Sequence, residues 1–158
     1  MKYFEDIQIG DKITLDRHTF TADEIKAFAQ RFDPQPFHLD EKAAARSHFG
    51  ALCASGWHTA AVWMRMLVDA KRRASEAMTA RGEPIAAMGP ALGFRDLQWL
   101  KPVYVNDTIE YHSEIVDKRT SNSRPGLGLV TIHSKGVNQK GDTVISFVST
   151  TFLQRRPG

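Results

Sequence analysis

Cysteine is almost absent from this chain of 158 residues, because Cys53 is the only one. An intrachain disulfide is therefore excluded, and a reducing compartment is the expected environment. The N-terminal segment MKYFEDIQIGDKI has no apolar region of the kind that signal peptides carry, and no apolar run in the chain is long enough to span a bilayer. We therefore expect a cytoplasmic protein without a membrane segment, from which nothing is cleaved.

Metal-binding and nucleic-acid-binding patterns are also missing. No set of His, Cys, Asp and Glu residues has the spacing of a metal site, so no metal ligand is predicted. The net charge of +3 comes with only short basic groups, at 71–73 and 155–156, and no aromatic residues are interleaved with them. Nucleic acid is therefore not an expected partner. A mildly basic chain does favour an anionic small molecule such as a nucleotide-bearing thioester.

The composition is that of an ordinary globular protein, with 42% hydrophobic and 25% charged residues. A chain of this length can bury a core without disulfides or metals. No internal repeat, low-complexity segment or linker divides it. The sequence thus predicts a single domain over residues 1–158.

Hydrophobic periodicity predicts one strand and three helical segments in the first half of the chain. A strand over 12–20 precedes a helix that begins after Thr21, where Glu24 completes a capping box, and ends near Phe32. A short helix is expected over 40–46. The longest helix should open at Ser55-Gly56 and finish by Gly82. The residues of its apolar stripe, which we expect in the core, are Trp57, Ala60, Ala61, Met64, Leu67 and Val68.

After Pro84 the pattern changes to a period of two, which is typical of strands. The expected strands are 85–88 with 92–100, then 107–118, 127–137 and 143–154. Short connections join the last three, so they should form an antiparallel meander. Helices before strands indicate an α+β fold, in which an antiparallel sheet wrapped around the long central helix buries both.

The most informative segment is Phe32-Asp33-Pro34-Gln35-Pro36-Phe37-His38, which carries an acid and an imidazole five positions apart. Each proline fixes its own φ and biases the residue before it towards extended geometry, so an irregular segment is predicted instead of a helix. Two interpretations stay open from these residues alone. Asp33 ends the preceding helix and His38 is a packing residue, or the two side chains carry out chemistry together.

Asp33-x-Gln35-Pro36-x-His38, with Phe49-Gly50 and then Ser55-Gly56 opening a long helix, resembles the MaoC-like dehydratases. These are the (R)-specific enoyl-CoA hydratase branch of the hot-dog fold. The resemblance extends over nearly the whole chain, through Tyr3-Phe4-Glu5-Asp6 with Gly10, Lys101-Pro102-Val103 and Asp107-Thr108. Gln35 departs from the family, which usually has Asn at this position. The additional methylene moves the amide, and this bears on substrate preference more than on fold.

The resemblance implies addition of water to a trans-2-enoyl-CoA, giving the (R)-3-hydroxyacyl-CoA, with CoA carried by the substrate and no separate cofactor. Asp33 and His38 would hold one water and share the proton transfers. The sequence does not assign the acid role to one of them and the base role to the other. The N–H of Gly56, in the first turn of a helix, would stabilise the thioester oxyanion. Glycine would let the thioester carbonyl approach without a Cβ in the way. Ser55 and Gln35 complete the predicted substrate-binding set.

Other roles for these residues remain open. Ser55 can be a plain N-cap and Gly56 a tolerated first residue of the helix. A hot-dog thioesterase would direct water at the carbonyl carbon, and a non-catalytic acyl-CoA-binding subunit would keep only the fold. The resemblance also implies at least a homodimer. Residues that could line the pocket are Phe37, His48, Trp57, His58, Trp63 and Met64, and those that could contact CoA phosphates are Arg95, Lys101 and Arg124.

Overall fold

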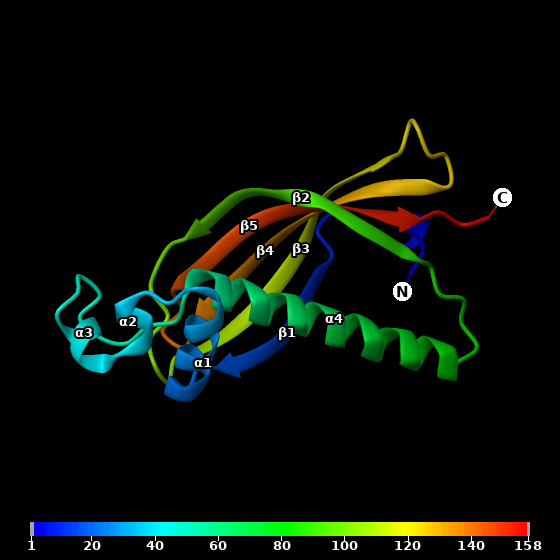
Figure 1. Cartoon of the computed structure of the whole chain (residues 1–158). Coiled ribbons are helices and arrows are strands. Elements are labelled where there is room, and N and C mark those ends of the chain that lie inside the picture. Colours follow the sequence, from blue (N-terminus) through cyan, green and yellow to red (C-terminus); the bar gives the residue numbers. More distant parts are fainter. Residues whose placement is uncertain (1, 158) are drawn as a thin grey trace.

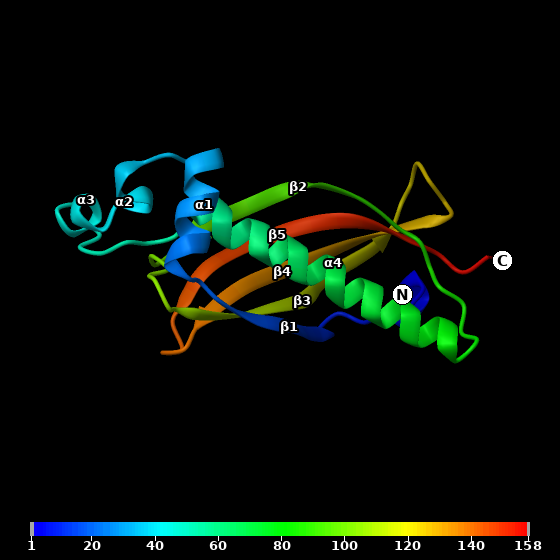
Figure 2. The same cartoon turned by 60° about the horizontal axis from the view of Figure 1, so that its bottom comes forward.

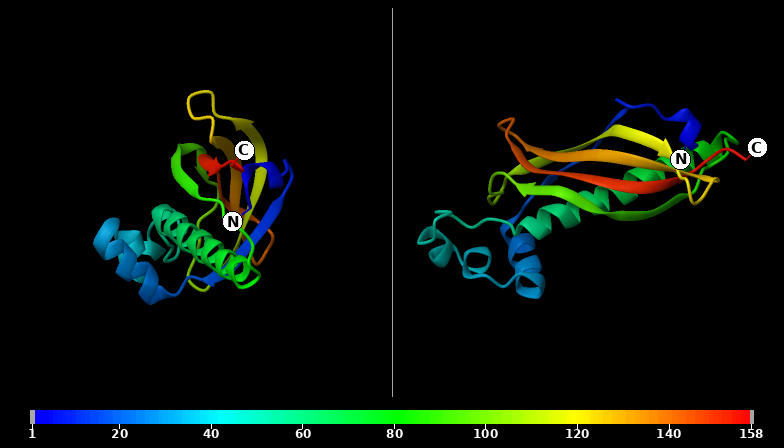
Figure 3. Two further views of the ribbon diagram at one scale, coloured as in Figure 1. Left: turned by 90° about the vertical axis from the view of Figure 1, so that its right-hand side faces the viewer. Right: turned by 90° about the horizontal axis from the view of Figure 1, so that it is seen from above.

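In the computed structural model, which describes residues 2–157, one long helix lies across an antiparallel sheet (Figure 1). The helices are α1 (Ala22–Phe32), α2 (Pro36–Leu39), α3 (Glu41–Ala45) and α4 (Gly56–Ala80), with a 3-10 turn at Phe4–Asp6. The strands are β1 (Lys12–Thr19), β2 (Met88–Trp99), β3 (Thr108–Thr120), β4 (Leu127–Asn138) and β5 (Thr143–Gln154). Seen along its length, the sheet curves around α4 (Figure 3).

The sheet has five strands in the order β1-β3-β4-β5-β2, and every neighbouring pair is antiparallel. The expected meander is confirmed as β3, β4 and β5, and the two remaining strands form the edges (Figure 2). This is the α+β hot-dog arrangement that the sequence predicted, with the sheet wrapped around α4. None of the helices within residues 2–157 combines the length and apolar character that a bilayer crossing requires.

The core lies between α4 and the sheet. Trp63 of α4 packs edge-on against Phe147 of β5, with the ring centroids 4.6 Å apart. The buried Tyr111 of β3 donates its hydroxyl to the Thr59 carbonyl at 2.9 Å, which ties the sheet to the first turns of α4. A neutral hydrogen bond of this kind contributes about 1 kcal/mol, while leaving its partner unsatisfied in the core costs more. These contacts hold the N-terminal half of α4 against the sheet.

The predicted start of α1 is confirmed. The Thr21 hydroxyl accepts from the Glu24 N–H, and the Glu24 carboxylate accepts from the Thr21 N–H, so the capping box is complete. Ile25 and Ala29 on one face of α1 are fully buried, whereas Phe32 at its end is exposed. The cap fixes where α1 begins, and the apolar face fixes which side of the helix is buried.

The prediction that the apolar stripe of α4 lies in the core was only partly right. Trp57, Met64 and Val68 are exposed, whereas the buried residues of α4 are His58, Thr59 and Trp63. Ala61 is exposed as well, and Ala60 and Leu67 are half-buried. The helix has apolar residues on two faces, and periodicity does not tell which of the two packs on the sheet.

Two other expectations need correction. The segment around Pro36 was expected to be irregular, yet Pro36–Leu39 forms one helical turn with Pro36 as its first residue. Proline suits that position because its fixed φ is helical and its missing N–H would have no partner there. The strands expected at 85–88 and 92–100 are one strand, Met88–Trp99, with irregular pairing.

We expect Thr21→Ala to lower the free energy of unfolding by about 1 kcal/mol, because the substitution removes the hydroxyl that caps α1. Urea denaturation followed by circular dichroism measures the change. The control is Gln30→Ala on the exposed side of the same helix, which should shift the value by less than about 0.5 kcal/mol. Equal stability of Thr21→Ala and the control would contradict a stabilising cap.

Candidate active site

The acid of the informative segment lies where α1 ends. Asp33 is the C-cap of α1, and its N–H donates to the Ala29 carbonyl at 2.9 Å. Helices α1, α2 and α3 gather at the end of the molecule where α4 begins (Figure 1). The structural interpretation of Asp33 as a helix end is therefore correct, but this position also brings its carboxylate to the mouth of α4.

Both carboxylate oxygens of Asp33 are held by donors. The Ser55 hydroxyl donates to Oδ2 at 2.6 Å, and the Gln35 side-chain amide donates to Oδ1 at 2.9 Å. Partial burial raises the pKa of Asp33, but these two hydrogen bonds and the neighbouring His38 outweigh it, so the pKa lies below its usual range. Asp33 is thus held as an oriented carboxylate.

His38 lies on α2 and is 5% exposed. Its Nδ1 is 2.7 Å from the carbonyl oxygen of Cys53, and because a carbonyl only accepts, Nδ1 must carry the proton. In the neutral ring, Nε2 is then an acceptor, and it lies 3.5 Å from Asp33 Oδ2. Two acceptors therefore lie next to each other, and one water molecule beside them can donate a hydrogen to each.

Ser55 and Gly56 open α4 as predicted. The Ser55 oxygen accepts from the Trp57 N–H at 3.2 Å, which caps the helix, while its hydrogen is directed to Asp33. Within residues 2–157, the N–H of Gly56 has no hydrogen-bond acceptor. It belongs to the first turn, where unpaired donors and the helix dipole favour negative charge. The structure therefore brings Asp33, His38 and this N–H to one place.

Glycine at position 56 has a packing reason that the sequence did not reveal. A Cβ built on Gly56 would lie 2.5 Å from Cε2 and 2.6 Å from Nε1 of Trp99, so the indole ring occupies the space of that Cβ. Real Cβ atoms do not approach other atoms this closely, so glycine is needed here because Trp99 packs directly on the backbone.

A pocket of about 390 Å³ opens beside these groups. Asp33, Gln35, His38, Ser55 and Gly56 all contribute to its wall, so the five predicted site residues share one cavity. Most of the remaining wall is apolar, and it is formed by Phe37, Phe49, Cys53, Ala54, Trp57, Thr59, Trp99, Leu100, Lys101, Pro102, Val103 and Val144. The cavity combines a polar end with an apolar body, as small-molecule sites generally do.

Several secondary candidates lie elsewhere. Trp63 is in the core, and Met64 is exposed on α4 away from the pocket wall. His48 stacks on Phe49 with centroids 3.8 Å apart and is not part of the wall. Of the three basic residues proposed for CoA phosphates, Lys101 alone lines the pocket. Arg124 instead lies over the Phe152 ring, and Arg95 is also outside the pocket.

His58 is a packing residue. It is buried in the first turns of α4, and its ring stacks in parallel on Phe28 of α1 with centroids 4.6 Å apart. Burial, together with the nearby His18, lowers the pKa of His58 to about 4 despite the opposing effect of Glu24. A neutral imidazole therefore joins α1 to α4 and helps to fix Asp33 relative to Gly56.

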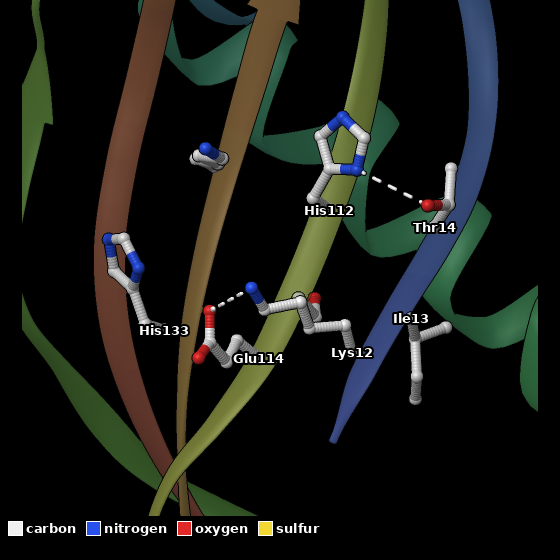
Figure 4. Close-up of a pocket in the computed structure, with 8 residues that line it drawn as sticks. Lys12, Ile13, Thr14, His112, Glu114 and His133 are labelled. Atoms are coloured by element: carbon white, nitrogen blue, oxygen red, sulfur yellow. Dashed lines mark hydrogen bonds and ion pairs between the residues drawn. The ribbon is translucent and has the colours of Figure 1, made fainter. Parts of the chain in front are cut away.

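A second hollow, of about 220 Å³, lies on the sheet face opposite α4 (Figure 4). Two of its charged groups are paired with each other. Lys12 forms an ion pair with Glu114 at 3.7 Å, and His112 lies between Thr14 and Glu110. Within the described part of the chain, no group of three His, Cys, Asp or Glu residues is placed to hold a metal ion.

Sequence reasoning missed two contributors. The first is the Cys53 carbonyl, which fixes the His38 tautomer and which no side-chain pattern reveals because it belongs to the backbone. The second is Trp99, whose position depends on strand pairing about forty residues beyond Gly56 in the sequence. Its place directly before the Leu100-Lys101-Pro102 segment was the available signal.

The chain matches known proteins along most of its length. The family model described as "MaoC like domain" matches residues 6–137. The crystal structure of the MaoC-like dehydratase from Rhodospirillum rubrum is 39% identical in sequence, covers 100% of both chains and superposes with a TM-score of 0.85.

Two curated relatives match this chain over different lengths. The uncharacterized protein YdeM of Bacillus subtilis is 27% identical over 151 residues, which is 96% of this chain and 98% of that protein. Mesaconyl-CoA hydratase of Cereibacter sphaeroides is 34% identical over 65 residues, which is 41% of this chain and 19% of that enzyme. The chain is therefore similar to YdeM over its full length and to the hydratase over a part.

We expect Gln35→Ala to raise the pKa of Asp33, because the substitution removes a donor that stabilises the charged carboxylate. Titration of the Asp33 carboxyl carbon by 13C NMR measures the pKa. Gln8→Ala, at an exposed glutamine near the N-terminus, is the matched control and should leave it unchanged. An identical pKa in wild type and Gln35→Ala would show that the amide does not act on this carboxylate.

Proposed function

This chain belongs to the MaoC-like hydratase and dehydratase family, and we propose that it interconverts a trans-2-enoyl-CoA and the (R)-3-hydroxyacyl-CoA. The observation that carries the proposal is the pair of acceptors, Asp33 Oδ2 and His38 Nε2, 3.5 Å apart in the pocket. A hydrolase needs one activated water, whereas a hydro-lyase needs a water and a proton delivered to carbon. The pair supplies both from one place.

In the hydration direction, water held by Asp33 and His38 attacks Cβ of the enoyl group. One water proton passes to the pair as the C–O bond forms. The electrons of the double bond move to the thioester oxygen, which accepts a hydrogen bond from the Gly56 N–H. Cα then takes a proton from the Asp33–His38 pair, and the site returns to its initial protonation state. Dehydration follows the same steps in reverse.

The apolar walls suit the acyl chain, with Val103 and Val144 among the buried residues that line the pocket. Lys101 is the cationic residue of the wall and forms an exposed ion pair with Asp142 at 2.6 Å. Exposed pairs contribute little to stability, so the ammonium group is available to a phosphate or carboxylate of the substrate. The pocket thus fits an anionic acyl thioester.

We expect Asp33→Asn to lower kcat for hydration of crotonyl-CoA by about 100-fold or more, with KM changed only a few-fold, because the amide cannot accept the water proton. Loss of the conjugated enone absorbance measures the rate. The control is Asp40→Asn, a carboxylate outside the pocket that caps α3, where Asn is an equally good cap.

The same assay separates the alternatives. Release of free thiol without loss of enone absorbance would indicate a thioesterase and contradict hydration. Equal hydration rates for wild type and Asp33→Asn would exclude Asp33 from the reaction. A protein that binds crotonyl-CoA without changing it would be a non-catalytic acyl-CoA-binding subunit.

We further propose that two copies of the chain pair through β2 and α4. The two edges of the sheet differ in character. β1 exposes the charged Lys12, Asp16 and Arg17 beside a single large apolar residue, Ile13, whereas β2 exposes Leu92 and Phe94. An exposed apolar edge strand attracts a second strand. This edge adjoins the exposed residues of α4, which are Trp57, Met64 and Val68. The Trp57 ring packs against the Trp99 ring of β2, with the ring centroids 5.0 Å apart. Apolar residues therefore continue from the strand onto the helix.

In sedimentation velocity, we expect wild type to have about twice the chain mass of 17.7 kDa, and Leu92→Glu to shift the protein towards monomer. A charge buried at a pairing edge has no partner and costs several kcal/mol. Ile13→Glu, which puts the same charge at an exposed position of the opposite edge, should stay dimeric. A monomeric wild type would contradict pairing and leave the hydration proposal unaffected.

A further inference from the structure

A bulge in β2 turns Trp99 towards α4. Between the pairs Arg95–Val148 and Gln98–Ser146, β2 has one residue more than β5. Asp96 lies in this bulge with a φ of 55°, a left-handed conformation that Asp tolerates better than most residues. An extra residue reverses the alternation of side chains along a strand, and bulges near active sites redirect side chains in this way.

The side chains on either side of the bulge show this reversal. Phe94 packs inward on Phe147, with centroids 5.2 Å apart. Without the bulge, residues 97 and 99 would point away from α4. With it, Leu97 packs against the core, and Trp99 pairs with the fully buried Ile145. Paired residues of neighbouring strands point to the same face, so Trp99 points to the side of α4.

The Trp99 indole then lies at the mouth of α4. Its Nε1 is 2.6 Å from the position that a Gly56 Cβ would occupy. Cα–Cβ bonds in a helix tilt towards the N-terminus, which is also where the free N–H groups of the first turn point. The indole nitrogen is therefore a close neighbour of the backbone N–H that would hold the thioester oxygen.

The indole N–H is free to bind a ligand. Within residues 2–157, Trp99 Nε1 donates no hydrogen bond, and the side chain lines the pocket with the residue 44% exposed. Indole nitrogen only donates, so it offers the pocket a neutral hydrogen bond that does not change with pH. A neutral donor beside a backbone donor is a common composition of an oxyanion-binding site.

We propose that the Trp99 indole N–H is the second donor to the thioester oxygen, acting together with the Gly56 N–H. This inference rests on the hydration proposed above. The negative charge that develops on the oxygen during water addition would then be shared by two hydrogen bonds. The bulge at Asp96 would have the function of delivering this donor, because a regular β2 would point Trp99 away from the site.

The test uses crotonyl-CoA with a 13C-labelled thioester carbonyl, bound to the Asp33→Asn protein so that hydration does not remove it. Each hydrogen bond to the carbonyl lowers its stretching frequency, which isotope-edited infrared difference spectroscopy measures. Replacing Trp99 in this background by 3-benzothienylalanine keeps the shape of the ring and substitutes sulfur for N–H. We expect the carbonyl frequency to return part of the way towards that of free crotonyl-CoA.

In the otherwise wild-type protein, Trp99→Phe should lower kcat by about 100- to 1,000-fold, the range for loss of one oxyanion donor, with the pH profile unchanged in position. If the carbonyl frequency is the same with benzothienylalanine as with Trp99, the indole is not a second donor to the thioester oxygen. That result would leave the hydration proposal unaffected. Failure of crotonyl-CoA to bind Asp33→Asn at all would overturn both proposals.

Discussion

The Ser55 hydroxyl is the contact on which the site depends. Its oxygen accepts from the Trp57 N–H and so caps α4, while its hydrogen is donated to Asp33 Oδ2 at 2.6 Å. One hydroxyl thus joins the end of α1, which carries Asp33, to the start of α4, which carries the proposed oxyanion donor. A charge-assisted hydrogen bond is stronger than a neutral one, and this one is buried, since Ser55 is 1% exposed.

The rest of the fold holds this junction in place. Tyr111 fixes the first turns of α4 to the sheet, and the His58–Phe28 stack fixes α1 to α4. His38 reaches Asp33 because one helical turn begins at Pro36, and the Cys53 carbonyl orients its ring. Each group of the proposed active site is therefore positioned by an element that packs elsewhere, which is the preorganisation that electrostatic stabilisation of a transition state requires.

Local signals in the sequence were read correctly. The Thr21–Glu24 capping box and the Ser55 N-cap are decided by neighbouring residues, and the meander follows from short turns. The motif residues Asp33, Gln35 and His38 were likewise found from their order in the chain. The features that were missed or wrongly predicted depend on residues distant in sequence. The Gly56–Trp99 contact follows from a strand bulge, and the exposure of Trp57 and Val68 depends on which face of α4 meets the sheet.

In the proposed reaction, Asp33 and His38 act on one water at one face of the enoyl group. Hydration of crotonyl-CoA in D2O tests it directly, since proton NMR of the product shows where deuterium at Cα lies relative to the hydroxyl at Cβ. Because both groups that exchange protons with this water lie 3.5 Å apart in the same wall, deuterium and hydroxyl should add to the same face. Addition to opposite faces would require a second proton donor across the pocket and would contradict the account.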